Sequence, residues 1–223
     1  MEKEDKLGRK SKGTFSMYTI YTAFFTGGAF SIIGSLVAAP NIYLDRLILT
    51  AFGCFLAHWV LTHAFHDLFH YDDEERKKMS TVSKNRLKIL IVVSFIILYS
   101  IAGYLTLKAG LLVIIFTIIG TILSMYAKRL LYHEAMYAFA GFFASLGSFY
   151  VQTSYFAFDL LTLKSLLVST FAFFTCYGWI HLYRLDHYGW SAKERNKGLY
   201  FTKFGVLFLI IYLLIDKVNY WGW

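Results

Sequence analysis

The stretch "LILTAFGCFLAHWVLTHAF" (residues 47–65) has no formally charged residue, and "HDLFHYDDEERKK" (residues 66–78) follows it directly. Its 19 residues are about the number that a helix needs to cross the hydrocarbon core of a bilayer. The polar stretch then brings two more histidines and a run of carboxylates. The sequence here predicts a membrane-spanning helix that ends on histidines and acids at the interface.

The rest of the chain repeats this pattern of long apolar runs and short polar connections. Hydrophobic residues make up 57% of the chain and charged residues 16%, a composition typical of integral membrane proteins. Backbone groups in lipid must be hydrogen-bonded within the segment, so the runs are expected to be helices. We predict one all-α membrane domain, residues 1–223, with a polar N-terminus over residues 1–16. Seven spans are expected: Met17–Ala39, Leu47–Phe65, Ile89–Leu107, Ala109–Ala127, Ala135–Phe158, Ser165–Tyr183 and Leu199–Ile215.

The basic residues predict the orientation of these spans. With a cytoplasmic N-terminus in the cell membrane, 18 of the 22 Lys and Arg residues fall on the inner side. Only Arg46, Lys108, Lys164 and Lys217 fall outside. The net charge of +8 is therefore interpreted as a topology signal. A nucleic-acid partner is not expected, because no soluble module carries a basic face.

The histidine-rich stretch also predicts a binding site. If the helix continues through it at about 100° per residue, five side chains lie within an arc of about 100°. These are His63, His66, Asp67, His70 and Glu74. In this set His66 with His70, and His63 with Asp67, have the i, i+4 spacing that lets two side chains share a divalent ion. The alternative is a belt of interfacial polar residues followed by a solvated charge run.

Two segments carry a resemblance to a known family. The segment "HDLFHYDDE" (residues 66–74) resembles the first aspartate-rich motif of the UbiA superfamily of intramembrane prenyltransferases, and it follows the second span as in that family. The segment "YAKRLLYHEAMYAFAGFFASLGSFYVQTSYF" (residues 126–156) is similar to the branch that prenylates 1,4-dihydroxy-2-naphthoate in menaquinone synthesis. In that second segment the matching residues are Lys128, Arg129, Glu134, Gly147, Tyr150, Gln152 and Thr153.

The resemblance implies transfer of a prenyl group from a polyprenyl diphosphate to an aromatic or quinone-precursor acceptor. Family chemistry uses metal ions and basic side chains to neutralise the diphosphate leaving group. The catalytic residues implied are Asp67 and Asp186, and those for the diphosphate are Lys128, Arg129, Arg184 and Lys193. By the resemblance the acids Asp67, Asp72, Asp73 and Glu74 would hold metal, and the spacing described above adds His63, His66 and His70 as metal ligands.

Three departures from the family pattern leave alternatives open. Histidines stand where the family has oxygen ligands, so manganese or zinc is an alternative to the expected magnesium. The second motif is thin, with Asp186 and Glu194 as its acids. Family members have about nine helices and seven are expected here, so the wall of the site could be open or could be completed by a second copy or another membrane chain.

Two further functional hypotheses stand beside prenyl transfer. One is a family member that has lost catalysis and binds lipid or a partner. The other is a membrane hydrolase or oxidase with a histidine-bound metal. Its ligands would come from His58, His63, His66, His70, His181 and His187.

Overall fold

The computed structural model of the protein describes residues 17–69, 71–72, 82–126, 133–188 and 190–220, and all regular secondary structure in these ranges is helical. The predicted all-α fold is confirmed for this part of the chain. The elements, with η marking a π-helix, are α1 (Met17–Ala23), η1 (Phe24–Ala29), α2 (Phe30–Leu36), α3 (Leu44–Leu56), η2 (Ala57–Ala64), α4 (Phe65–Phe69), α6 (Lys84–Ala109), α7 (Leu112–Tyr126), α8 (His133–Thr153), α9 (Leu160–Tyr188) and α10 (Ala192–Tyr220).

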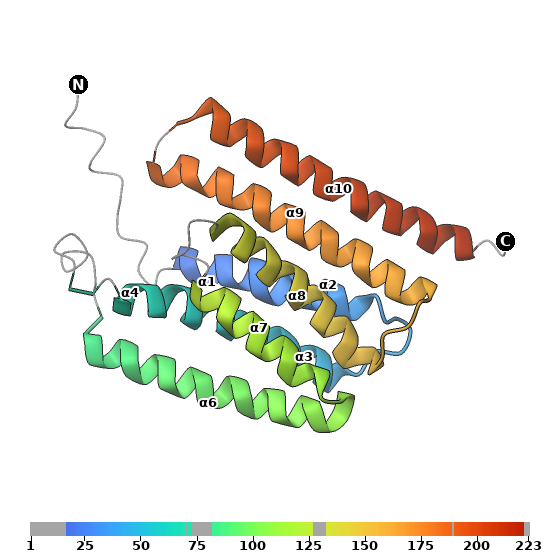
Figure 1. Ribbon diagram of the computed structural model, residues 1–223, viewed down its shortest axis with the longest axis horizontal. Helices are drawn as coiled ribbons and strands as arrows, with labels where there is room; N and C mark the ends of the chain where they lie inside the picture. The colour runs from blue at the N-terminus through green and yellow to red at the C-terminus, as the bar shows by residue number, and fades with distance from the viewer. Residues whose placement is uncertain (1–16, 70, 73–81, 127–132, 189, 221–223) are drawn as a thin grey trace.

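The helices lie side by side and alternate in direction (Figure 1). α1, η1 and α2 form one continuous rod, and α3, η2 and α4 form the next. The ends of α4, α7 and α9 therefore lie at the same end of the bundle as the starts of α6, α8 and α10 (Figure 1). We call this the histidine end, because α4 carries His66 there, and the opposite end the arginine end, because Arg46 lies there.

Five helical stretches of the described ranges are long and apolar enough to cross a membrane. They are Thr19–Leu36, Leu44–Phe69, Lys84–Ala109, Leu160–Tyr183 and Ala192–Lys217. α7 is apolar but shorter. Each of the seven predicted spans overlaps a helix, but only five of them meet this standard. An integral membrane protein is supported, whereas the number of spans stays a prediction.

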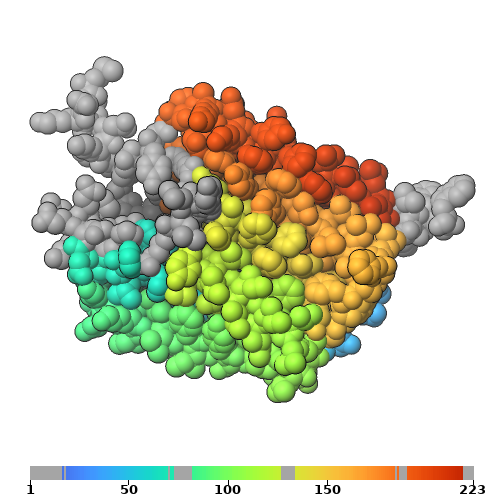
Figure 2. Space-filling model, in the orientation of Figure 1, coloured from blue at the N-terminus to red at the C-terminus, as the bar shows by residue number. Residues whose placement is uncertain are grey.

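The outer faces of the bundle are apolar. Large hydrophobic side chains are exposed along α6, such as Ile89 and Ile96, and along α10, such as Ile210 and Leu214. In the space-filling view the α9–α10 hairpin forms one flank of the bundle, while α6 and α7 form the opposite flank (Figure 2). Contact with a lipid bilayer accounts for such exposure, because lipid chains solvate these side chains as a protein core would.

Small residues bring the inner helices close together. Gly34 of α2 faces the backbone of Ser145 in α8 so closely that a Cβ at Gly34 would overlap the Ser145 carbonyl. Beside this contact the hydroxyls of Ser31 and Ser148 are hydrogen-bonded at 2.7 Å. Small side chains and buried hydroxyl pairs are typical of helix packing in membranes, where apolar surface gives no driving force between helices.

The arginine end is tied together by the Arg46 side chain. Its Nη1 donates to the carbonyl oxygen of Val151 at 2.9 Å, and Nη2 donates to that of Lys108 at 3.1 Å. These carbonyls belong to the last turns of α8 and α6, which have no partner within their own helices. Gln152 is held there too, because its amide exchanges hydrogen bonds with the backbone of Tyr43. These bonds hold the start of α3 against the ends of α6 and α8.

The contact at Gly34 yields a stability prediction. Gly34→Ala should lower the unfolding free energy by about 1–3 kcal/mol, because the added methyl group forces α2 and α8 apart. Thermal unfolding of detergent-solubilised protein measures the change. Gly103→Ala is the matched control, since a Cβ at Gly103 meets no atom within 4 Å. Equal melting temperatures for both variants would contradict the proposed close packing.

Candidate functional site

A cavity of about 850 Å³, counted with the space at its opening, lies inside the bundle. Its walls come from η1, α3, η2, α6, α7 and α8, and most of the lining is apolar. α7 contributes one stripe of residues, Val113, Phe116, Thr117, Gly120, Thr121 and Ser124. The spacing of three and four residues places these side chains on one face of the helix.

Toward the arginine end the cavity lining is mostly apolar, and the hydroxyls of Thr50 and Ser148 there are bonded to backbone carbonyls of their own helices; polar ring side chains lie toward the other end. Leu49, Leu105 and Val113 line it toward the arginine end. His58 and Tyr137, both buried, line it toward the histidine end. An elongated ligand with an apolar chain and a polar head matches this arrangement, because each part meets a wall of similar polarity.

The polar part of the cavity is built where two π-helical segments meet. Thr26 of η1 and His58 of η2 are in hydrogen-bond contact, with Oγ1 and Nε2 3.1 Å apart. The Thr26 hydroxyl donates its single hydrogen to the carbonyl of Thr22 at 2.7 Å, so its oxygen accepts from His58 Nε2–H. The neutral His58 ring therefore carries its hydrogen on Nε2. π-helical turns are rare and often occur at functional sites.

Gly27 allows the two segments to approach. A Cβ at this position would lie 2.5 Å from the carbonyl oxygen of Cys54, nearer than a methyl group can come. Glycine is therefore required beside Thr26. The close approach lets the short threonine side chain reach the histidine on the neighbouring rod.

His58 also links the cavity to the histidine-rich stretch. Its ring centroid lies 5.6 Å from that of His63 and 5.1 Å from that of Tyr137. Residues five apart face each other in η2, because a π-helix has more residues per turn than an α-helix. The sequence analysis assumed α-helical steps, so it did not predict contact between the rings of His58 and His63.

The predicted arc of five side chains assumed one continuous α-helix, and the described residues depart from it, while His70 and Glu74 lie outside them. His63 lies in a π-helix, α4 ends at Phe69, and Tyr71 and Asp72 are in a turn. His66 and Asp67 stay adjacent on α4, with Nδ1 and Oδ1 3.8 Å apart and side chains only 15% and 16% exposed. The structure thus retains a mostly buried histidine and carboxylate at the end of the second rod.

Much of the predicted site lies outside the described residues. His70, Asp73, Glu74, Lys128 and Arg129 belong to this group. Arg184 and Asp186 lie in the last turns of α9, but their side chains are also outside the described part, and Lys193 is exposed in the first turn of α10.

The described residues contain no group of three or more side chains able to hold a metal ion. Among the described residues, His63, His66 and Asp67 are therefore not gathered around one point. The predicted metal and diphosphate sites stay predictions.

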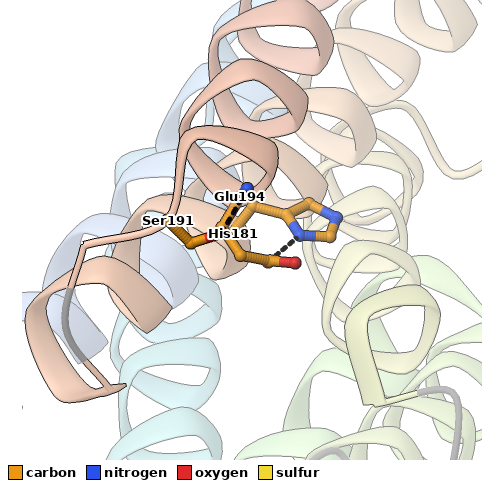
Figure 3. A network of polar contacts seen from close by, with 3 residues as sticks. All are labelled: His181, Ser191 and Glu194. Atoms are coloured by element: carbon orange, nitrogen blue, oxygen red, sulfur yellow. Dashed lines mark hydrogen bonds and ion pairs between the residues drawn. The ribbon is translucent and has the colours of Figure 1, made fainter.

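The turn between α9 and α10 carries a second polar pair. His181 Nδ1 lies 2.7 Å from Oε2 of Glu194, and Ser191 Oγ accepts from the Glu194 backbone N–H at 3.4 Å (Figure 3). Sequence reasoning placed Glu194 among the acids of a second motif. The structure pairs it with His181 instead, a partner that spacing along the chain does not indicate.

The Thr26–His58 contact can be tested by a change that keeps the shape of the side chain. Thr26→Val should destabilise the protein by about 1–3 kcal/mol, because the buried His58 N–H loses its acceptor. Thr50→Val is the matched control, since Thr50 also lines the cavity and donates to the carbonyl four residues before it. Thermal unfolding of both variants gives the comparison. If Thr50→Val is as destabilising as Thr26→Val, the histidine bond adds nothing.

No protein-family model matches the sequence, and no curated protein or solved structure is similar to it. The resemblance to the UbiA superfamily therefore depends on the motifs quoted above.

Proposed function

We propose that the protein is an intramembrane prenyltransferase, which moves a prenyl group from a polyprenyl diphosphate to an aromatic or other lipid-precursor acceptor. The observation that supports this most is the cavity, which is apolar over most of its length and ends at His58 and Tyr137. A prenyl chain is apolar throughout and a diphosphate is strongly polar. The two ends of the cavity suit these two parts.

The proposal includes the membrane topology. Seven helices span the cell membrane, with the N-terminus and the histidine end on the cytoplasmic side. The distribution of basic residues supports this orientation, since the four that fall outside include Arg46 and Lys108 at the arginine end. A water-soluble diphosphate would then approach the histidine end from the cytoplasm.

The residues of the cavity would act chiefly by binding the chain and excluding water. Each buried CH₂ group of a prenyl chain contributes about 0.8 kcal/mol when it leaves water. Dry walls also protect an allylic cation from hydrolysis. Phe116 and Tyr137 line the cavity, and aromatic rings can stabilise positive charge that lies over their faces.

The histidine end would hold the diphosphate. In the reaction the C–O bond to the diphosphate breaks, its electron pair leaves with the diphosphate, and the allylic carbon bonds to the acceptor, which loses a proton. We assign Asp67 and Asp186 to this centre, with Lys128, Arg129, Arg184 and Lys193 as the cationic contacts. A divalent cation, magnesium by the resemblance and manganese or zinc by the histidines, would supply further charge stabilisation for the leaving group.

Filling the cavity should impair binding of the chain. Gly120 lies at the centre of the α7 stripe, and a Cβ there meets no atom within 4 Å. Gly120→Leu should weaken binding of labelled geranylgeranyl diphosphate about tenfold or more. The leucine side chain would displace part of the prenyl chain, whose burial contributes at least about 1.4 kcal/mol to the binding free energy.

The control for this variant is Gly103→Leu, which changes a glycine that has equal room but does not line the cavity. Binding is measured with purified protein in lipid nanodiscs. If the two variants bind the diphosphate equally well, the cavity is not the site of the prenyl chain.

Removing the carboxylate of Asp67 should abolish transfer. Asp67→Ala should lower the rate by at least about 100-fold while the protein stays folded, since the loss falls on leaving-group stabilisation. The assay uses labelled farnesyl or geranylgeranyl diphosphate, aromatic and quinol-precursor acceptors, and magnesium, manganese or zinc in turn.

Asp45→Asn serves as the control, because Asp45 lies on the same rod at the arginine end and accepts a hydrogen bond from Tyr104. If wild-type protein binds the prenyl diphosphate but releases no free diphosphate from it with any of the metals, prenyl transfer is excluded. Lipid binding without catalysis then becomes the better account.

A further inference from the structure

His181 has a feature that its role in joining two helices does not explain. The side chain is 2% exposed, and Nδ1 is bonded to Glu194. The second ring nitrogen, Nε2, is buried and meets no hydrogen-bond partner in the described part of the chain. Nε2 points away from Glu194 (Figure 3).

The bond to Glu194 fixes the state of the ring. An ionised carboxylate only accepts hydrogen bonds, so Nδ1 carries the hydrogen that it donates. Nε2 of the neutral ring then presents a lone pair. Burying an acceptor without a partner costs about 1–3 kcal/mol. The link between α9 and α10 uses Nδ1 alone, so it does not account for the lone pair that is buried on Nε2.

The surroundings of His181 are aromatic. The ring of Tyr177 lies 5.4 Å from it between centroids, and the ring of Phe201 is stacked at 6.2 Å with an interplanar angle of 16°. His181 lies toward the histidine end of α9, one helical turn after Tyr177. Tyr177 in turn packs against the cluster of Tyr137, which lines the cavity. A hydroxyl group that reaches Nε2 would have to be carried on a flat apolar body, which can pack against these rings.

We propose that His181, oriented by Glu194, is a proton acceptor for the hydroxyl group of a ligand. The ligand O–H donates to Nε2. When the proton moves, the O–H bond breaks, its electron pair stays on the ligand oxygen, and the imidazolium is ion-paired with Glu194. A carboxylate bonded to one imidazole nitrogen fixes the tautomer of the ring and orients the other nitrogen. This site does not depend on prenyl transfer, although such a transfer releases a proton that His181 could take.

The experiment measures binding rather than turnover. Full-length protein with ¹⁵N-labelled histidine is placed in lipid nanodiscs, and the ring nitrogens are observed by NMR. The probes are 1-naphthol and 1-methoxynaphthalene, which share a flat body and a tendency to enter lipid but differ in the O–H group. The His181→Asn variant assigns the resonances and keeps a donor for Glu194.

The proposal predicts that His181 is protonated on Nδ1 without ligand and that 1-naphthol, but not 1-methoxynaphthalene, shifts its Nε2 resonance. It also predicts that 1-naphthol binds about tenfold more tightly than the ether, as one hydrogen bond allows. In His181→Asn this difference should vanish while the melting temperature stays close to that of the wild type.

Two results would overturn the proposal. One is an Nε2 resonance of His181 that, at saturation, shifts equally with both probes or shifts with neither. The other is an unchanged preference for 1-naphthol in the folded His181→Asn variant. A failed prenyl-transfer assay bears on neither result, so the two proposals fail separately.

Discussion

The hydrogen bond between Thr26 and His58 is the contact on which the interior of this bundle depends. A histidine that is 5% exposed among apolar helices needs a partner for its N–H, because an unsatisfied donor is costly where no water reaches it. The partner comes from a neighbouring rod, whose backbone can approach only because Gly27 lacks a side chain. Both rods take π-helical form at this point, and the polar end of the cavity is the result.

The helices were largely predictable, because lipid leaves the backbone few choices. The uncharged run Leu47–Phe65 lies within the rod Leu44–Phe69, and the other predicted spans also overlap helices. The π-helical segments were not predictable in the same way. Hydropathy shows only which residues avoid water. A π-helical turn depends instead on which carbonyl oxygen accepts from each backbone N–H and on contacts with another rod. The five-residue spacing of His58 and His63 was the only local sign.

The candidate site was predictable only in part. The sequence indicated that His66 and Asp67 belong to a polar helix end, and the structure places both there with little exposure. It did not indicate the cavity, since Gly120, Thr121 and Tyr137 become neighbours only when α7 and α8 meet. Gln152 is a residue that the sequence placed in a functional motif and that has a structural role instead. It belongs to a segment that resembles a prenyltransferase motif, but the backbone of Tyr43 holds it at the arginine end.

The central claim is that a prenyl chain occupies the cavity, and photo-crosslinking tests it most directly. A geranylgeranyl diphosphate analogue with a diazirine on its terminal isoprene unit would be bound to the protein in nanodiscs and irradiated, and the labelled residues found by peptide mass spectrometry. The account predicts labels on the cavity stripe of α7, near Val113 and Phe116, and on Leu105 opposite. It also predicts that unlabelled geranylgeranyl diphosphate prevents them. Labels confined to exposed residues of α10, such as Ile210 and Leu214, would show that the chain lies in the surrounding lipid and would contradict the account.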